Sequence, residues 1–402
     1  MKLKLKINVH SFLFNLVILL LWIKLLFSYL SVKLTYFQKG LTPNVESFNP
    51  LGLPENFSNN IELILLPVLF YIIIKYYKYY GRLKELIVVS FLMFFLNILT
   101  SLVNGKPLLD SLNYSFKLFL PFYLFCFLVA SKQWFGKDIK KTLIKTIKLC
   151  AILSIFALLF FNPSYNRLQD YLPIFFSGIH THNYVLVYLF IAISFFLYRK
   201  QSYIALLIFL ILSIAFLYYG YNVRTPIMVY LIYCLALVYL ISDIFKVLII
   251  KISVFLPLAV FFFFLITDIN ELSSGRLDMY SEKIKQLSEY NVIDWAFGKG
   301  SGSDLIYTDV WWWDKKGAHS DLLTFIVENG ILYFILFLYF FVKLLIYNNK
   351  LNLIYISILL GCLFSSTISN GVFTRPIAGY IFFMLLAYIY ININNNKTTI
   401  HQ

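Results

Sequence analysis

The chain has 402 residues, of which 60% are hydrophobic and 13% are charged, and its mean hydropathy is +0.78. A soluble domain could not bury this much apolar surface, so the composition excludes one and indicates a protein of the lipid bilayer. The formal net charge of +15 would suit a nucleic-acid-binding protein. The basic residues, however, lie at the ends of apolar runs and do not cover a solvated domain. We therefore expect no nucleic-acid partner.

Long apolar runs recur along the chain, at lengths of roughly 16–22 residues that suit helices crossing a hydrocarbon core of ~30 Å. The runs are continuously apolar and not alternating, which favours helices over a β-barrel. We therefore predict an all-α fold, a polytopic membrane helical bundle with about twelve transmembrane helices. The predicted spans are 11–32, 61–77, 86–103, 112–131, 147–162, 183–198, 203–220, 226–242, 247–267, 321–342, 353–370 and 376–392.

The connections between these spans differ in charge on the two sides of the membrane. With the N-terminus inside, the inner connections are short and basic, as at 132–148 and 199–200, and most acidic residues lie on the outer side. This is the positive-inside pattern, and it predicts that both termini are cytoplasmic. We find no internal repeat and no linker, and we interpret 1–402 as a single integral membrane domain.

The largest predicted segment outside the lipid is the loop 268–320 between spans nine and ten. It contains a short amphipathic helix. Its predicted faces are Leu277, Tyr280, Ile284 and Leu287 on one side, and Glu282, Lys283 and Lys285 on the other. The glycine-rich stretch Gly298–Ser303 follows. It resembles a phosphate cradle by composition, but it follows no strand and lacks the Lys-Ser/Thr ending of a P-loop, so we interpret it as a turn that folds the loop back.

Histidines and arginines are few on the predicted outer side, which makes each of them a candidate for chemistry. They are His180 and His182 before span six, His319 before span ten, Arg224 and Arg375 in short outer turns, and Arg276 at the start of the amphipathic helix. Several arginines at one rim indicate an anionic ligand, because the guanidinium stays charged and its planar fork matches phosphate oxygens. The alternative is that each arginine binds a lipid headgroup or caps a helix.

His319 is the histidine that is best suited to a chemical role. An imidazole with a pKa of ~6.5 can take a proton from a sugar hydroxyl, or donate hydrogen bonds to a phosphate when charged. Glu328 lies within span ten, where a carboxylate is costly and by default has a functional or pairing role with His319 or an arginine. Arg375, His182, His180 and Glu328 are candidates for substrate binding. No set of residues has metal-ligand spacing, so we expect neither a metal nor a cofactor.

These features together resemble the superfamily of O-antigen polymerases and O-antigen ligases, which are membrane glycosyltransferases of the bacterial envelope. The most specific similarity is a histidine and a small polar residue, His319-Ser320, followed by nine residues and Gly330–Tyr333. Further similarity lies upstream, in Gly298–Ser301, in Ser274–Arg276, and in Arg224–Pro226, where Val223 stands at the position of the usual serine.

The resemblance implies a metal-independent enzyme that acts on undecaprenyl-diphosphate-linked oligosaccharides at the periplasmic face of the bacterial inner membrane. Arg224 and Arg276 would hold the donor diphosphate, and His319 would activate the acceptor hydroxyl or stabilise the leaving group. Because nothing points to a covalent nucleophile, direct displacement would invert the anomeric carbon. Membrane lipid is an expected partner, and a chain-length regulator is a further candidate.

Polymerase and ligase would share this site and differ in the acceptor. A polymerase joins one lipid-linked repeat unit to another, whereas a ligase transfers the glycan to lipid A-core. We favour the polymerase because Phe/Ile/Lys-rich sequences of poor overall similarity are usual among polymerases. A lipid-linked glycan flippase is the alternative from another class, but it should have repeated halves and charge along a central path. Only Lys24, Lys117 and Glu328 lie clearly within the predicted spans.

Overall fold

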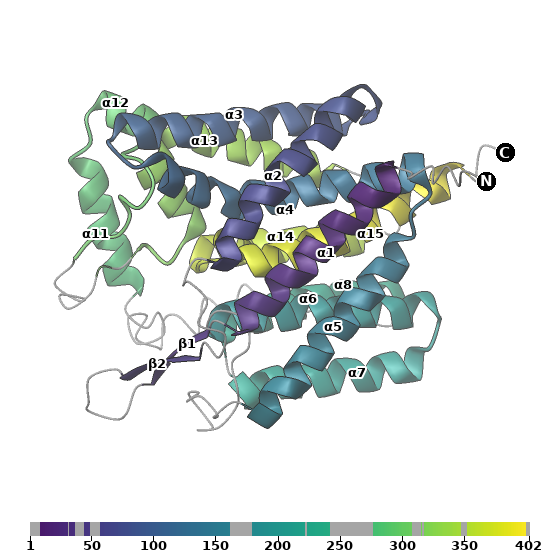
Figure 1. Cartoon of the computed structure of the whole chain (residues 1–402). Coiled ribbons are helices and arrows are strands. Elements are labelled where there is room, and N and C mark those ends of the chain that lie inside the picture. Colours follow the sequence, from purple (N-terminus) through teal and green to yellow (C-terminus); the bar gives the residue numbers. More distant parts are fainter. Residues whose placement is uncertain are drawn as a thin grey trace. The chain divides into compact units, whose positions relative to one another are not determined.

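The computed structural model of the chain is mainly α-helical, with one short β-hairpin (Figure 1). It describes residues 9–30, 32–36, 44–48, 57–160, 179–221, 223–241, 276–307, 315, 317–346 and 352–398. The predicted span 247–267 lies outside these residues, as do parts of the predicted loop 268–320. The chain divides into two compact units. Unit 1 comprises 1–84, 116–227 and 375–402, and unit 2 comprises 85–115 and 228–374.

Unit 1 holds most of the N-terminal helices and the last one. Its elements are α1 (Val9–Leu30), β1 (Val32–Tyr36), β2 (Asn44–Phe48), α2 (Phe57–Tyr76), the 3-10 turn η1 (Tyr77–Tyr79), the second part of α4 (Leu108–Phe135), α5 (Ile139–Phe160), α6 (Ile179–Arg199), α7 (Tyr203–Ala215), the π-helical turn η2 (Phe216–Tyr221) and α15 (Pro376–Thr398). The strands β1 and β2 pair antiparallel, with Val32 opposite Phe48.

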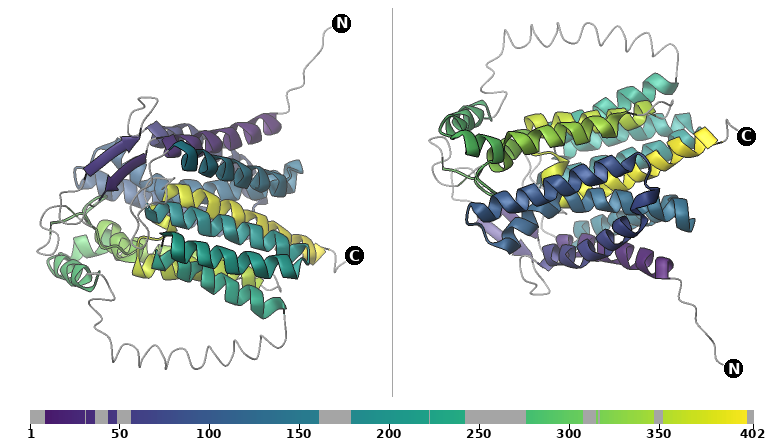
Figure 2. Two further views of the ribbon diagram at one scale, coloured as in Figure 1. Left: turned by 90° about the horizontal axis from the view of Figure 1, so that it is seen from below. Right: turned by 90° about the horizontal axis from the view of Figure 1, so that it is seen from above.

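The centre of unit 1 is α15, whose side chains from Ile377 to Ile391 are all buried. Helix α6 packs against it in parallel (Figure 2): Arg375 contacts Thr181 at the first turns, and the Phe196 ring contacts the Tyr388 ring further along. An α-helix rises ~1.5 Å per residue, so the stretch of α6 from His182 to Arg199 is ~27 Å long. This is close to the thickness of a bilayer core.

Unit 2 holds the remaining helices. Its elements are α3 (Leu83–Val103) from residue 85, the first turns of α4, α8 (Arg224–Ile241) from residue 228, α11 (Arg276–Ser288), α12 (Val292–Phe297), α13 (Asp321–Leu345), α14 (Asn352–Ile368) and the 3-10 turn η3 (Val372–Thr374). Helices α11 and α12 pack against α13 near its start (Figure 1). The rings of Phe325, Phe337 and Phe373 form part of the apolar core of unit 2.

Seven helices in the described part of the chain are long and apolar enough to cross a membrane, and up to eight if the bent α4 counts as one span. Their surfaces fit this environment. On α3, for example, Val88, Leu92, Phe95 and Leu99 are exposed at helical spacing. Such a stripe would be unfavourable in water but is well solvated by lipid. The chain is therefore a multi-pass helical membrane protein, as predicted.

A buried ion pair joins two of the helices in unit 1. The Lys24 ammonium on α1 lies 3.1 Å from the Glu62 carboxylate on α2, and both side chains are almost completely buried, at 1% and 2% exposure. The Tyr380 hydroxyl on α15 donates a hydrogen bond of 3.0 Å to the same carboxylate. Each charge would be costly within a span by itself, so the pair ties α1 to α2 and α15.

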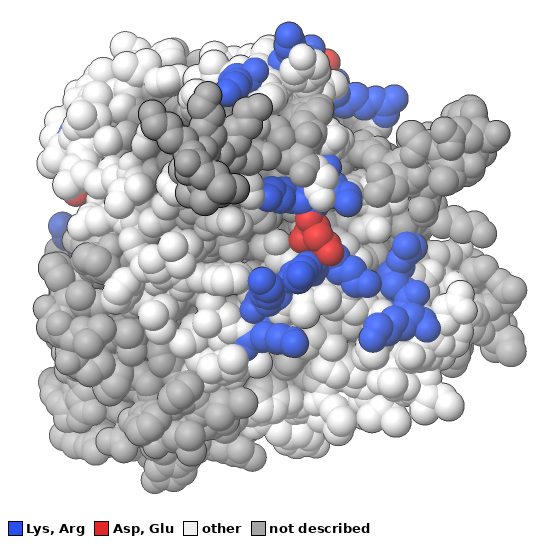
Figure 3. Space-filling view, turned by 45° about the vertical axis from the view of Figure 1, so that its right-hand side comes forward, with Lys and Arg blue, Asp and Glu red and all other residues white. Residues whose placement is uncertain are grey.

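Basic side chains lie at several helix ends of unit 1. Lys132 is in the last turn of α4, Lys140 in the first turn of α5 and Arg199 in the last turn of α6. On the face shown in Figure 3, Lys and Arg side chains gather around a small acidic patch. Connections of this kind, between the end of one helix and the start of the next, are where the sequence predicted the inner side of the membrane.

The ion pair predicts a specific pattern of stability. Lys24→Met and Glu62→Gln should each destabilise the protein by about 3–5 kcal/mol, because each leaves one buried partner uncompensated. The double variant Lys24→Met/Glu62→Gln should recover most of this loss, since Gln still accepts the Tyr380 hydroxyl. Thermal unfolding of the purified protein in detergent measures all three. Equal, additive losses in the double variant would contradict the pairing.

Candidate functional site

The predicted amphipathic helix forms as α11, but its faces were predicted only in part: Leu287 of the apolar face is buried, and so is Lys283 of the charged face. The buried residues are Met279, Lys283 and Leu287, whereas Ile284 is 63% exposed. The reason is the Asp304 carboxylate, which lies 3.1 Å from the Lys283 ammonium. Burial lowers the pKa of the Lys283 ammonium, and Asp304 opposes this shift because it favours the charged form.

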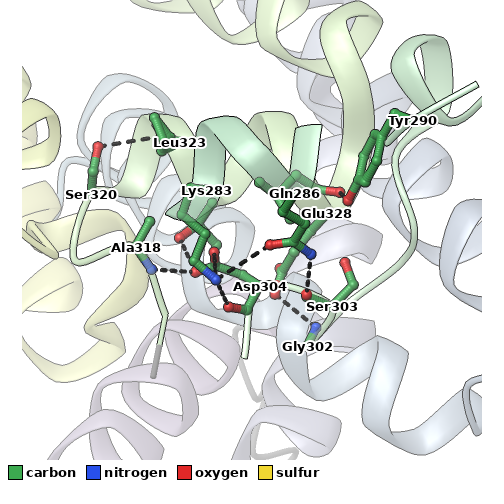
Figure 4. A network of polar contacts seen from close by, with 12 residues as sticks. Lys283, Gln286, Tyr290, Gly302, Ser303, Asp304, Ala318, Ser320, Leu323 and Glu328 are labelled. Atoms are coloured by element: carbon green, nitrogen blue, oxygen red, sulfur yellow. Dashed lines mark hydrogen bonds and ion pairs between the residues drawn. The ribbon is translucent and has the colours of Figure 1, made fainter. Parts of the chain in front are cut away.

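Asp304 is the centre of a polar network in unit 2 (Figure 4). Its backbone carbonyl accepts a second hydrogen bond from Lys283. Its other carboxylate oxygen, Oδ2, accepts hydrogen bonds from the Ala318 N–H at 2.9 Å and from the Thr324 hydroxyl at 2.7 Å. With 3% exposure, Asp304 thus links α11, the segment before α13 and the first turn of α13 from the interior.

His319 lies between two fixed neighbours and has an unusual backbone conformation. Its φ is 51°, a left-handed value that non-glycine residues rarely adopt. On one side, Ala318 is held by Asp304. On the other side, Ser320 caps α13 by accepting the Leu323 N–H at 3.4 Å. The strained conformation persists because both neighbours are held, and strain of this kind clusters at functional sites.

The C-terminal end of α14 anchors Arg276 and the residue that follows His319. The Ser320 hydroxyl, next to His319, donates a hydrogen bond of 3.3 Å to the Ser366 carbonyl. Arg276, the first residue of α11, donates one of 3.0 Å from Nη1 to the Ile368 carbonyl. Two of the predicted catalytic residues therefore belong to segments attached to the same last turn of one helix.

Two buried carboxylates beside His319 were missed by sequence reasoning, Asp304 and Asp321. The Asp321 carboxylate accepts the Gly371 N–H at 2.9 Å and the Thr374 hydroxyl at 2.8 Å, which fixes the turn after α14. The available signal was their rarity: the chain has only 19 acidic residues, and Asp321 follows His319 by two positions. Asp304 holds the backbone before His319, whereas Asp321 holds the turn after α14.

The glycine-rich stretch is a turn whose amide groups are already occupied. The Lys299 and Gly300 N–H groups donate to the Val327 and Glu328 carbonyls, and the Gly302 N–H donates to the Glu328 carboxylate at 2.7 Å. The Ser301 N–H donates to the Ser101 hydroxyl. A phosphate cradle needs free N–H groups. These contacts favour the turn interpretation, and they give the buried Glu328 carboxylate a partner that the sequence did not indicate.

Gly298 and Gly330 lie where two backbone segments cross. Helix α13 breaks at Gly330, whose φ is 75°, and Gly298 at the end of α12 has a φ of 77°. A Cβ on Gly330 would overlap the backbone of Ala296 and Phe297, and a Cβ on Gly298 would overlap the backbone of Glu328. The glycine of the predicted family motif thus has a structural reason in this chain: it permits this close crossing.

The four remaining predicted residues belong to unit 1. Arg375 donates a hydrogen bond of 3.1 Å to the Thr181 hydroxyl, and its guanidinium carbon lies 5.9 Å from the centre of the Tyr184 ring. His182 is fully buried, with its ring 4.7 Å from that of Tyr221. His180 is half-buried in the first turn of α6, and Arg224 is exposed at the start of α8. The first turn of α6 thus joins Arg375 to the two histidines.

The predicted site residues therefore form two sets. Unit 2 contains His319, Arg276 and Glu328, and unit 1 contains Arg224, Arg375, His180 and His182. Within the residues that the structure describes, no three His, Cys, Asp or Glu side chains are grouped in a way that could hold a metal ion. The sets contain imidazoles, two of them half-buried, and guanidinium groups, which are groups that transfer protons and bind phosphate.

The glycine crossing leads to a prediction about stability. Gly330→Ala should destabilise the protein by about 2–4 kcal/mol, because it combines overlap with the α12 backbone and an unfavourable φ. The matched control is Gly302→Ala, with a φ of 80° but no atom within 4 Å of the added Cβ. The control should lose only about 1 kcal/mol in thermal unfolding experiments. Equal losses would show that the crossing contributes nothing.

Comparisons with known proteins do not add to this geometry. No family model, no curated protein and no solved structure matches the chain. The resemblance to O-antigen polymerases and ligases therefore rests on the short motifs around His319, Arg276 and Arg224.

Proposed function

We propose that the chain is a metal-independent glycosyltransferase, an O-antigen polymerase that joins undecaprenyl-diphosphate-linked repeat units. One observation carries this proposal: the segments of Arg276 and His319 are both attached to the last turn of α14. An anion-binding guanidinium and a proton-accepting imidazole on one anchor are what transfer from a lipid diphosphate requires. The motifs quoted from the sequence give the same two residues.

In the proposed reaction, an acceptor sugar hydroxyl attacks the anomeric carbon of the donor repeat unit. The new glycosidic C–O bond forms as the C–O bond to the diphosphate breaks, and the proton of the hydroxyl passes to His319. The lipid diphosphate leaves with the bonding electron pair. Because this is a single displacement with no covalent enzyme intermediate, the product has the inverted anomeric configuration.

Arg276 is suited to stabilise the charge that develops on the leaving group. A guanidinium has five N–H donors, and Arg276 uses one on the Ile368 carbonyl. The anchored side chain can therefore still offer donors to phosphate oxygens, without a large reorganisation during the reaction. In unit 1, Arg224 is proposed to contact phosphate, and Arg375, His180 and His182 are proposed to bind substrate.

The proposal includes the finer topology that the sequence predicted. The chain would cross the bacterial inner membrane about twelve times, with both termini in the cytoplasm and the site at the periplasmic face. Transport is less well supported. Within unit 1 the two charges at Lys24 and Glu62 neutralise each other at almost no exposure, so they do not provide the open charged path that a flippase needs.

The activity can be measured with the purified protein and a defined undecaprenyl-diphosphate-linked repeat unit, in buffer with a metal chelator. We expect longer glycans from the wild type, and a loss of at least ~100-fold in the rate of chain extension for His319→Ala and for Arg276→Ala. Arg276→Lys should retain part of the activity because it keeps the charge. Lys285→Ala is the matched control, since it removes a 69% exposed charge from the same helix.

Full chain extension by both alanine variants would refute the proposed site. Addition of lipid A-core as the acceptor separates the two related enzymes: a ligase would transfer the glycan to it, whereas the proposed polymerase would leave it unmodified. Vesicles that move the lipid-linked sugar across the bilayer without lengthening it would instead identify a flippase.

A further inference from the structure

A cavity of ≈ 400 Å³ opens among four helix ends of unit 1. The ends are the last turn of α4, the first turns of α5, the last turn of α6 and the C-terminal half of α15. Helices α6 and α15 run in parallel, so this cavity lies ~27 Å along α6 from the turn that contacts Arg375. It is therefore separate from the candidate residues Arg375, His180 and His182 of the same unit.

The lining of this cavity is strongly basic. Lys132, Lys140, Arg199 and Lys200 line it together with a single carboxylate, that of Asp138. The Asp138 carboxylate already accepts the Lys141 N–H at 3.0 Å, at the start of α5. Among the residues described by the structure, none of the four cations forms an ion pair with a carboxylate. The cavity thus holds a surplus of positive charge that an anion would neutralise.

Two further features of the cavity indicate the kind of anion. Ile139, the first residue of the 22-residue helix α5, lines it, so the positive end of that helix dipole adds to the attraction. The apolar side chains of Ile144, Phe196 and Ile391 also line it. A fully hydrated ion has no use for such walls, whereas an amphiphile can place its charged head among the cations and its glycerol and acyl part against the apolar side chains.

We propose that this cavity binds the phosphate headgroup of an anionic phospholipid. The cavity lies at the end of α6, which is long and apolar enough to cross a membrane, and an end of such a helix lies at headgroup depth. Basic pockets between helices on the cytoplasmic side are suited to such headgroups. Bound lipid would bridge α4, α5, α6 and α15 at this end of the unit.

The test compares two double variants that remove the same charge. Lys140→Gln/Arg199→Gln removes two cations from the cavity, whereas Lys141→Gln/Lys145→Gln removes two exposed cations of α5 that do not line it. The purified full-length protein is titrated with dioleoylphosphatidylglycerol in detergent, and bound lipid is counted by native mass spectrometry. Dioleoylphosphatidylcholine and inorganic phosphate are the further probes. Size-exclusion chromatography verifies that each variant is folded.

The cavity variant should bind phosphatidylglycerol about 25-fold more weakly than the wild type, at about fivefold for each charge removed, and the control variant should bind it like the wild type. Phosphatidylcholine should bind weakly to all three proteins. Equal losses in the two double variants would overturn the proposal, because they would show general attraction between charges. Displacement of the lipid by millimolar inorganic phosphate would also overturn it, since the site would then be one for free phosphate.

Discussion

The close crossing of two backbones at Gly298 and Gly330 is the constraint on which the candidate site of unit 2 depends. It brings the end of α12 against the break in α13, so that the turn after Gly298 can place its amide groups on the carbonyls of α13 and on the Glu328 carboxylate. That turn ends at Asp304, which holds Ala318. A series of contacts thus connects the two glycines, which have no Cβ, to the left-handed conformation of His319.

Buried charges are paired in both units, with different consequences. The pair of Lys24 and Glu62 ties helices within unit 1 and leaves little charge to solvate. The pair of Lys283 and Asp304 instead brings α11 inward, and α11 carries Arg276 at its first position. A buried pair contributes little net stability when compared with apolar residues, but breaking it is costly. In unit 2 the ion pair of Lys283 and Asp304 therefore mainly fixes the position of α11.

The helical spans could be predicted from the sequence because long apolar runs determine them locally. The candidate residues in the turns between helices followed from the same reasoning and from short motifs. The buried position of Lys283 could not be predicted, because amphipathic patterning assigns a charged residue to the solvent side of a helix. Its partner Asp304 lies outside α11, in the segment after α12. The pairing of Glu62 with Lys24 was also missed, because the two residues lie on different helices. Pairing between distant residues reverses the preference of each residue by itself, and no local pattern records it.

We propose that Arg276 and His319, whose segments are both attached to the last turn of α14, act as one coupled unit in a single reaction. A double-mutant cycle tests it most directly: chain extension is measured for Arg276→Ala, His319→Ala and the double variant. If both residues stabilise one transition state, the double variant should be hardly slower than the slower single variant. Strictly additive losses in activation free energy would contradict the claim, since the two residues would then act independently.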